Sequence, residues 1–185
     1  GRARTERRST VVRCFLMRRP KSLEIPVLLR KLFVRGIRVE VLQMKSFLVA
    51  NPKGGSGKST LATNLAGYFA KCGHRVMLGD TDRQQSARDW LHLRPAALPA
   101  IRAWEISEDS PARPPKGTSH VVLDTPAGLR GKALGRVLKA VSRVIVPVQP
   151  SLFDILATRQ FLEKLLEERD IRKGKTYVAV VGMRV

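Results

Sequence analysis

The amino-acid sequence predicts an α/β protein built on a doubly wound, mostly parallel sheet. From Lys45 onward, short apolar runs rich in Val, Ile and Leu alternate with segments of helical pattern. The runs are too short for helices and mostly apolar on both faces, which is typical of strands covered by helices on two sides. Because crossovers between parallel strands are right-handed, we expect helices on both faces of the sheet.

Six strands and four helices are expected along the chain. The predicted strands are the apolar runs 46–50, 75–80, 101–105, 120–124, 143–147 and 176–181. Between them, helical patterns cover 58–72, 84–93, 129–140 and 151–169. Gly73 ends the first helix, where a left-handed cap favours glycine. Prolines indicate surface loops at 94–99 and 108–117, because proline removes a ladder donor.

Composition indicates one globular domain with a preference for polyanions. The 185 residues have the size of a single domain, and 43% hydrophobic residues are enough for a packed core. The formal net charge of +20 favours nucleic acid, acidic lipid or nucleotide as partners, although a basic solvated surface is the plainer interpretation. Residues 1–43 contain 12 basic and 3 acidic residues, so the remainder still carries a charge of +11.

The first 43 residues differ from the rest of the chain. They are Arg-rich, are interrupted by Pro20 and Pro26, and follow no clean helical or strand period. Met44 stands directly before the first predicted strand, so we expect 44–185 to form the domain and 1–43 to be upstream sequence outside it. A basic DNA-contacting arm and an Arg-rich targeting peptide are the alternatives. The chain stops directly after a strand, so we also expect the domain to be truncated at its C-terminus.

Cysteine content and hydropathy exclude several classes of protein. Cys14 and Cys72 are too few for a disulfide framework or for a metal site with several thiolates. No segment approaches the ~18 apolar residues of a membrane-spanning helix, and none has the pattern of a secretory signal. We therefore expect a soluble, cytoplasmic protein without stable membrane insertion.

A phosphate-binding loop is predicted between the first strand and the first helix, which makes the expected fold one of the P-loop NTPase type. Its residues are Lys53, Gly54, Gly55, Ser56, Gly57, Lys58, Ser59 and Thr60. The loop fits GxxxxGK[ST] except that Pro52 replaces the first glycine. Glycines let backbone N–H groups turn toward phosphates, and the start of the helix adds its positive end. Lys58 would neutralise the β- and γ-phosphates of ATP, and Ser59 would offer its hydroxyl to magnesium.

Acidic residues end two of the predicted strands at the edge where the loop is expected. Asp124 ends the run 120–124, the position of a magnesium-associated carboxylate, although it could instead cap a helix. Asp80 and Asp82 leave a second strand toward the same edge. One of them could position the attacking water and the other order the loop, or either could cap the helix that begins near Gln84.

Three motifs together resemble the ParA/MinD family of deviant Walker ATPases. They are KGGSGKST at 53–60, DTDRQ at 80–84 and VLDTPAG at 122–128. The resemblance covers 44–185, and the DxDxQ motif followed by Ser86 is more similar to ParA partition proteins than to MinD. Two departures are Arg83, where many ParA proteins have proline, and the missing C-terminal helices that carry much of the family's DNA-binding surface.

The resemblance implies a role for each residue of the site. Lys53 would be the signature lysine, which reaches across an ATP-bound homodimer to stabilise charge on the partner's phosphates. Gly54 would permit the close approach of two facing loops. By the same carry-over, Lys58 binds phosphate, Ser59 and Asp124 serve magnesium, Asp82 orients the hydrolytic water, and Asp80 supports the site.

The predicted helix that starts at Ser151 resembles the family segment that lies beside the nucleotide and changes with its state. Phe153 and Asp154 are candidates for contact with the partner subunit. A core Phe and a helix-capping Asp are the alternatives for these two residues.

The resemblance implies an ATP-switched dimer for plasmid partitioning or chromosome segregation. Such a protein binds nucleoid DNA nonspecifically in its ATP state, and a ParB-like centromere-binding partner stimulates its weak hydrolysis. The first alternative is a MinD-like membrane-associated positioning ATPase, which needs an amphipathic C-terminal helix. The second is a nucleotide-binding fragment without turnover. A metal-cluster reductase would need paired thiolates, which Cys14 and Cys72 do not supply.

Overall fold

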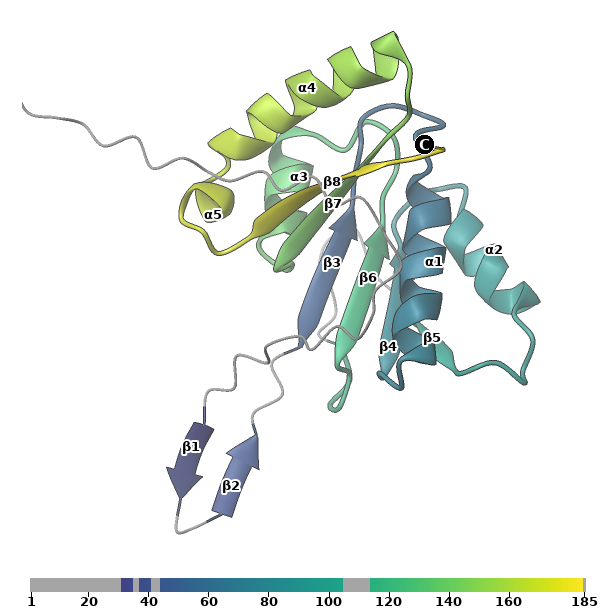
Figure 1. The fold of residues 1–185 in the computed structure, drawn as a ribbon, viewed down its shortest axis with the longest axis vertical. Coiled ribbons are helices and arrows are strands. Elements are labelled where there is room, and N and C mark those ends of the chain that lie inside the picture. Colours follow the sequence, from purple (N-terminus) through teal and green to yellow (C-terminus); the bar gives the residue numbers. More distant parts are fainter. Residues whose placement is uncertain (1–30, 35–36, 41–43, 105–113, 185) are drawn as a thin grey trace, which may run out of the picture.

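The centre of the fold is a six-stranded parallel sheet (Figure 1). The computed structural model describes residues 31–34, 37–40, 44–104 and 114–184. The sheet has the order β5-β4-β6-β3-β7-β8, and every neighbouring pair is parallel. Its strands are β3 (Lys45–Val49), β4 (Val76–Asp80), β5 (Ile101–Trp104), β6 (His120–Asp124), β7 (Arg143–Val148) and β8 (Tyr177–Gly182).

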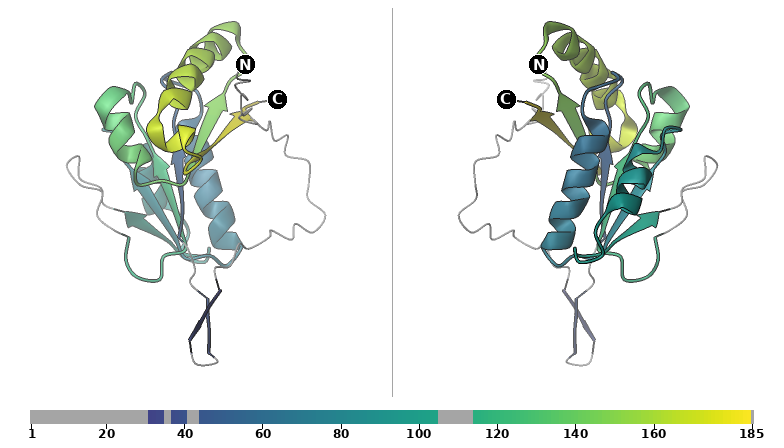
Figure 2. Two further views of the ribbon diagram at one scale, coloured as in Figure 1. Left: turned by 90° about the vertical axis from the view of Figure 1, so that its left-hand side faces the viewer. Right: turned by 90° about the vertical axis from the view of Figure 1, so that its right-hand side faces the viewer.

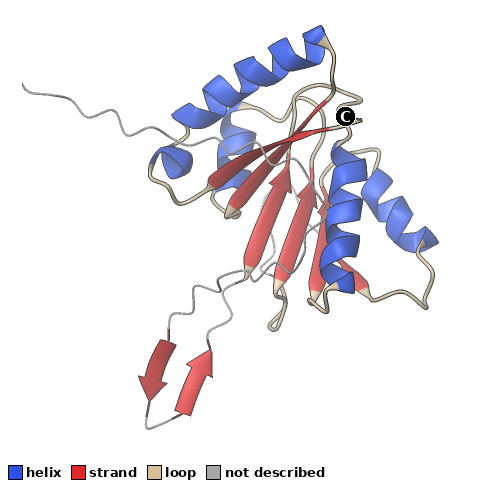
Figure 3. Cartoon of the chain, in the orientation of Figure 1, coloured by secondary structure: helices blue, strands red, loops and turns tan. Residues whose placement is uncertain are grey.

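Helices cover both faces of this sheet, as Figure 3 shows in colour by element type. They are α1 (Lys58–Lys71), α2 (Ser86–Leu93), α3 (Gly131–Leu138), α4 (Leu152–Glu167) and α5 (Arg169–Arg172). One core cluster joins α1 and α2 to one face, and a second joins α3, α4 and α5 to the other. The side views of Figure 2 show α1 and α3 on opposite sides of the sheet. The predicted doubly wound α/β fold is confirmed.

Burial on both faces explains why the central strands read as continuous apolar runs. Adjacent residues of a strand point to opposite faces, so Leu48 belongs to the α3-side core and Val49 to the α1-side core. In β6, Val121 and Val122 divide between the two cores in the same way. Neither face of these strands needs polar residues.

Strand order brings the polar residues of the sequence to one edge of the sheet. The chain leaves β3 for β4 on one side and leaves β6 for β7 on the other, so β3 lies where the connections diverge. Val49 pairs with Asp124, and Asp124 pairs with Asp80, which aligns the carboxyl ends of three neighbouring strands. Ligands of doubly wound sheets bind at such a point.

Three predicted helices are interrupted or shortened, and one of them, expected at 129–140, covers only Gly131–Leu138. The single helix expected at 151–169 is divided, because Glu168 adopts extended dihedrals (φ −63°, ψ 136°) between α4 and α5. The helix expected at 84–93 begins at Ser86, since Gln85 takes a left-handed φ of 50°. All six strands begin and end within one residue of the predicted bounds where the structure describes them.

An antiparallel hairpin of β1 (Lys31–Val34) and β2 (Ile37–Glu40) lies in the segment where no element was expected. It forms a two-stranded sheet of its own. The rest of 1–43, including Cys14, Pro20 and Pro26, lies outside the described residues, as do Glu105 and the first part of the predicted loop at 108–117. The domain boundary at Met44 stays a prediction. Within the described residues, no helix has both the length and the apolar character to cross a membrane.

A candidate nucleotide-binding site at the carboxyl edge of the sheet

The glycine-rich loop joins β3 to α1 and uses its glycines for two different purposes. Gly55 (φ 74°) and Gly57 (φ 90°) adopt left-handed backbone conformations, which glycine takes without strain. A Cβ at Gly57 would also meet Met183 Cε at 2.9 Å, whereas a Cβ at Gly54 would meet nothing within 4 Å. The N-cap Gly57 offers no side chain to the first amides of α1, so these donors are available to an anion.

Lys58 is a nearly buried cation at the centre of the loop. Only 7% of the residue is exposed, and its Nζ donates to the carbonyl oxygen of Lys53 at 3.0 Å. Burial lowers the pKa of Lys58, against the raising effects of Asp124 and Asp82. No ion pair within the described residues involves this ammonium group. A cation so placed is suited to a polyanionic ligand.

Asp124 presents a buried oxygen that lacks a partner. The residue is 1% exposed, and its Oδ1 accepts from the Thr125 amide at 3.0 Å. Its Oδ2 is buried and has no hydrogen-bond partner among the described residues. Burial raises the pKa of Asp124 to about 6, while the nearby Ser59 hydroxyl lowers it. A lone carboxylate oxygen beside a loop hydroxyl fits the donors that magnesium prefers.

The neighbouring backbone holds Asp124 in place. Thr125 Oγ1 donates to the Val49 carbonyl at 2.8 Å, and the amide and hydroxyl of Thr81 donate to the Asp124 carbonyl at 3.1 and 3.0 Å. These contacts connect the ends of β3, β4 and β6. The carboxylate therefore sits on a rigid platform, which favours a fixed ligand position.

Asp80 caps α2. Its Oδ2 accepts from the amides of Ala87 and Arg88 at 2.9 and 3.3 Å, and its Oδ1 accepts from the Asp82 amide at 2.9 Å. The capping alternative from the sequence is therefore the one that the hydrogen bonds support for this residue. Its direct contact with a nucleotide stays a prediction.

Asp82 lies in the turn between β4 and α2. Its Oδ1 accepts from the Gln84 amide at 3.1 Å, and the residue is partly exposed. The carboxylate is close enough to Lys58 to raise the pKa of that lysine. This position leaves Asp82 accessible to water, and its role in orienting a water molecule stays a prediction.

Lys53 is held by α4 of its own chain. Its Nζ donates to Asp154 Oδ2, and 38% of the lysine side chain is exposed. Asp154 is buried and also accepts from Ser151 Oγ, the N-cap of α4. The bond from Lys53, and next the bond from Ser151, lower the pKa of Asp154. Ser151, and not Asp154, is therefore the N-cap of α4, and the Asp154 carboxylate instead contacts the loop through Lys53.

Two buried residues that the sequence analysis missed fix the start of the loop. Asn51 is 3% exposed, and its Nδ2 donates to the Pro147 carbonyl at 2.7 Å and to Thr158 Oγ1 at 2.9 Å. Its Oδ1 accepts from the Lys53 amide at 2.9 Å. A polar residue directly after an apolar strand was a signal for Asn51. Nothing in the sequence marked Thr158, which is 107 residues away.

The remaining predicted loop residues differ in exposure. Ser56 is fully buried, and its hydroxyl has no partner among the described residues. Thr60 is exposed, and its carbonyl accepts from the side chains of Thr63 and Asn64 in the first turns of α1. Among the residues that the structure describes, no group of three or more His, Cys, Asp or Glu could hold a metal. A magnesium ion here would therefore take ligands from the nucleotide as well as from Ser59 and Asp124.

The glycine loop, the buried lysine and the strand-end carboxylate define a P-loop nucleotide-binding domain of the doubly wound type. Residues 47–183 match the CobQ/CobB/MinD/ParA nucleotide binding domain, so the chain belongs to that family. The resemblance drawn from the three sequence motifs is thereby confirmed.

Curated relatives include two proteins from bacteria. The chain is 39% identical over 109 residues to Maintenance of carboxysome distribution protein A of Gloeobacter kilaueensis, which covers 58% of this chain and 50% of the relative. It is 30% identical over 159 residues to the Chromosome-partitioning ATPase Soj of Thermus thermophilus, covering 69% and 64%. The chain thus spans between half and two thirds of the length of these relatives.

Solved structures of similar fold include a plasmid partition protein from Borrelia burgdorferi (TM-score 0.62, 18% identity, covering 77% of this chain and 80% of that one). Cobyrinic acid a,c-diamide synthase from Mycobacterium smegmatis with bound ADP and magnesium has a TM-score of 0.59 at 21% identity, covering 76% and 74%. The pNOB8 ParA bound to nonspecific DNA has a TM-score of 0.53 at 17% identity, covering 69% and 61%. At these identities the likeness concerns the fold.

Proposed function

We propose that this chain binds ATP with magnesium at residues 53–60 and hydrolyses it weakly as the switch of a partition-type ATPase. The observation that carries the proposal is a buried lysine without an ion-pair partner and a buried carboxylate oxygen without a donor, both beside a glycine loop. Among the described residues, Lys58 donates to a backbone carbonyl and forms no ion pair, and Asp124 Oδ2 has no hydrogen-bond donor. Leaving such groups buried is costly unless a ligand completes them. A metal-bound triphosphate supplies both missing partners.

Each loop residue then has a definite task in nucleotide binding. Lys58 would exchange its bond to the Lys53 carbonyl for phosphate oxygens, and the amides from Gly54 to Ser59 would surround the same oxygens. Ser59 and Asp124 would hold magnesium, which neutralises phosphate charge when bound. Asp82 would orient the attacking water from the partly exposed turn after β4.

Dimerisation in the ATP state is the next part of the proposal. The Lys53 side chain is 38% exposed and would leave Asp154 to contact the partner's phosphates. A Cβ at Gly54 would meet no atom of the described residues within 4 Å, so an approach from outside is a sufficient reason for glycine there. Beside this lysine, four exposed apolar side chains of α4 offer a contact area: Leu152, Phe153, Ile155 and Leu156.

The biological role follows from the relatives and is proposed with them in view. One relative is named for chromosome partitioning and one for carboxysome distribution, and a structure of similar fold was solved with nonspecific DNA. We infer a nucleoid-associated protein of the cytoplasm that moves a plasmid or chromosome copy, with a ParB-like protein as activator. Its DNA binding would fall steeply with salt, because phosphate contacts release counterions.

Light scattering of the full chain with ATP and magnesium tests the switch, with Lys53→Ala and Lys58→Ala as variants and nucleotide affinity measured alongside. Dimerisation of the wild type, its loss in both variants and retained ATP binding in Lys53→Ala alone would support the proposal. If the wild type binds ATP and stays monomeric, the chain is a nucleotide-binding fragment without the switch. If the wild type binds no ATP, the proposed site is wrong.

A further inference from the structure

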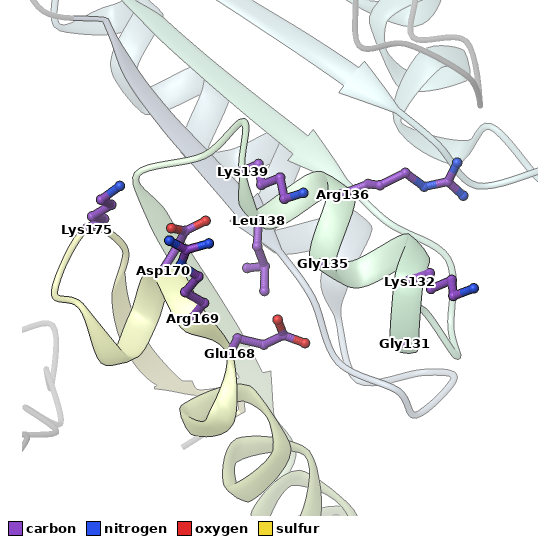
Figure 4. Close-up of a pocket in the computed structure, with 10 residues that line it drawn as sticks. All are labelled: Gly131, Lys132, Gly135, Arg136, Leu138, Lys139, Glu168, Arg169, Asp170 and Lys175. Carbon is purple, nitrogen blue, oxygen red and sulfur yellow. The ribbon is translucent and has the colours of Figure 1, made fainter.

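A pocket of about 920 Å³ lies between α3 and the junction of α4 with α5, as Figure 4 shows. Its basic lining residues are Lys132, Arg136 and Lys139 of α3 with Arg169 and Lys175 of the opposite wall. A Cβ at Gly135 would lie only 3.8 Å from Glu168 Oε2, so the two walls are close to each other here. We refer to these five basic side chains and their pocket as the α3–α5 surface.

The charge of the α3–α5 surface is not neutralised within the described part of the chain. All five basic side chains are exposed, and neither of the two ion pairs there involves any of them. Glu168 and Asp170 also line the pocket, which leaves an excess of three positive charges. Arg172 and Lys173 follow in the next turn and are exposed as well. A substantial part of the domain's basic excess is therefore gathered in one place.

The basic residues of α3 form a row. Positions 132, 136 and 139 are spaced four and three residues apart, so they share one side of the helix, while Leu134 and Leu138 pack into the core. In Figure 4 the side chains of Lys132 and Arg136 extend away from Glu168. The row spans about 10 Å along the helix axis, close to the axial rise of three phosphate-to-phosphate steps along one DNA strand.

The α3–α5 surface is remote from the phosphate loop. α3 ends just before β7 begins, and the turn with Lys175 leads into the start of β8, so the pocket belongs to the amino edge of the sheet. The phosphate loop follows the carboxyl end of β3, at the opposite edge. The two sites share no lining residue.

We infer that the α3–α5 surface binds the phosphate backbone of duplex DNA without regard to sequence. The choice of DNA as the polyanion rests on the proposed function, whereas the location rests on the charges described here. Among the lining residues, the large apolar side chain Leu138 is buried, and none is an exposed large hydrophobic. A membrane surface would need apolar residues to insert, and a protein partner would need an apolar centre to the interface. Phosphates need only the cations.

Glu168 should oppose this binding. Its carboxylate lies within the pocket, so it repels phosphate and lowers the local positive potential. Replacing it with glutamine should strengthen DNA binding. Such a gain of affinity cannot arise from misfolding, which makes this variant the sharper one.

The test is fluorescence anisotropy of a labelled duplex of arbitrary sequence, titrated with the full chain at several salt concentrations with and without ATP and magnesium. The variant Lys132→Gln/Arg136→Gln/Lys139→Gln should weaken binding at least tenfold and reduce the salt slope by about 2 to 3. Glu168→Gln should strengthen binding by about twofold to fivefold. ATP affinity should be unchanged in both.

Matched controls carry the same change of net charge elsewhere. Lys71→Gln/Arg102→Gln/Lys116→Gln alters three exposed cations outside the pocket, and Asp89→Asn removes one exposed carboxylate of α2. Equal effects in variant and control would overturn the inference, because net charge alone would then explain the binding. If the wild type binds ATP but no DNA, the inference is also wrong, whereas the proposed nucleotide site still stands.

A vesicle-binding assay tests whether the surface binds an anionic membrane instead of DNA. Vesicles of phosphatidylcholine with phosphatidylserine are sedimented with wild type and with the triple variant. If the α3 substitutions abolish vesicle binding and leave DNA binding intact, the surface belongs to a membrane and the inference is wrong. If vesicle binding is absent or unaffected while DNA binding is lost, the inference stands.

Discussion

The two edges of the sheet use charge in opposite ways. At the carboxyl edge, Lys58 and Asp124 are almost completely buried and few in number, and each is fixed by a neighbour in the fold. At the amino edge, the α3–α5 surface displays five exposed cations that form no ion pair with another described residue. A buried charge gains strongly from one matching ligand group, whereas exposed charges act additively and are screened by salt. The contrast predicts a stringent nucleotide site and a permissive polyanion surface in one domain.

The largest expected effect is at the buried lysine. Lys58→Ala should reduce ATP affinity by at least about 100-fold, because it removes a desolvated charge from the phosphate position. Lys71→Ala, at the exposed end of α1, should leave affinity within about twofold. Isothermal titration calorimetry measures both. A comparable loss in the two variants would remove the distinction between buried and exposed charge.

Asp124→Asn should separate function from stability. Because burial raises the pKa of this carboxyl to about 6, above its ordinary 3.8, the folded chain binds the proton more tightly than the unfolded chain. Stability therefore falls as pH rises from about 4 to 6, and the ionised carboxylate costs about 1 to 3 kcal/mol above that. Without nucleotide, the variant should unfold at a higher temperature at pH 7.5 and should lose magnesium-dependent ATP affinity. An equal or lower unfolding temperature would contradict this.

At the amino edge, the titration of His120 is expected to change stability with pH in the opposite direction. His120 is buried against His74, with ring centroids 4.0 Å apart, and burial followed by the nearby cationic groups lowers its pKa from 6.5 to about 4. The neutral ring is thus favoured in the folded chain, and stability is lost as pH falls from about 6.5 to 4. Chemical denaturation should show a loss of about 1 to 3 kcal/mol in that window.

In the wild type, the titrations of Asp124 and His120 change stability with pH in opposite directions. The contribution of His120 is therefore best measured in the Asp124→Asn variant. His120→Phe in that background should flatten the acid side of the profile. Persistence of the slope would assign it to another group.

The smallest effect should come from Asp154→Asn, which releases Lys53 from its own chain. The ion pair is partly exposed, so its loss should favour the ATP-dependent dimer by no more than about fivefold. Light scattering at several protein concentrations measures the shift. Glu163→Gln, which breaks the exposed pair with Arg159 on the same helix, is the control. A weaker dimer in Asp154→Asn would mean that this carboxylate belongs to the interface.

Local signals account for what the sequence could predict. The apolar runs ended within a residue of the observed strands, and the glycines with Lys58 marked the loop, because chain neighbours determine both features. The hydrogen bonds of Asn51 to Pro147 and Thr158 join residues about a hundred positions apart, which no local pattern reports. The break at Glu168 and the stacking of His74 on His120 likewise depend on packing. The spacing of the basic residues on α3 can be read from the sequence, whereas their position opposite α5 depends on how the chain folds.

The start of the phosphate loop is attached to α4 at two points. Asn51 Nδ2 donates to Thr158 and Lys53 Nζ donates to Asp154, one helical turn away, so two bonds join the start of the loop to the first half of α4. The helix is about 24 Å long, and its far end reaches Glu168, which lines the basic pocket. If Lys53 moved toward a partner subunit, its bond to Asp154 would be lost, while the bond from Asn51 to Thr158 would keep the loop attached to α4.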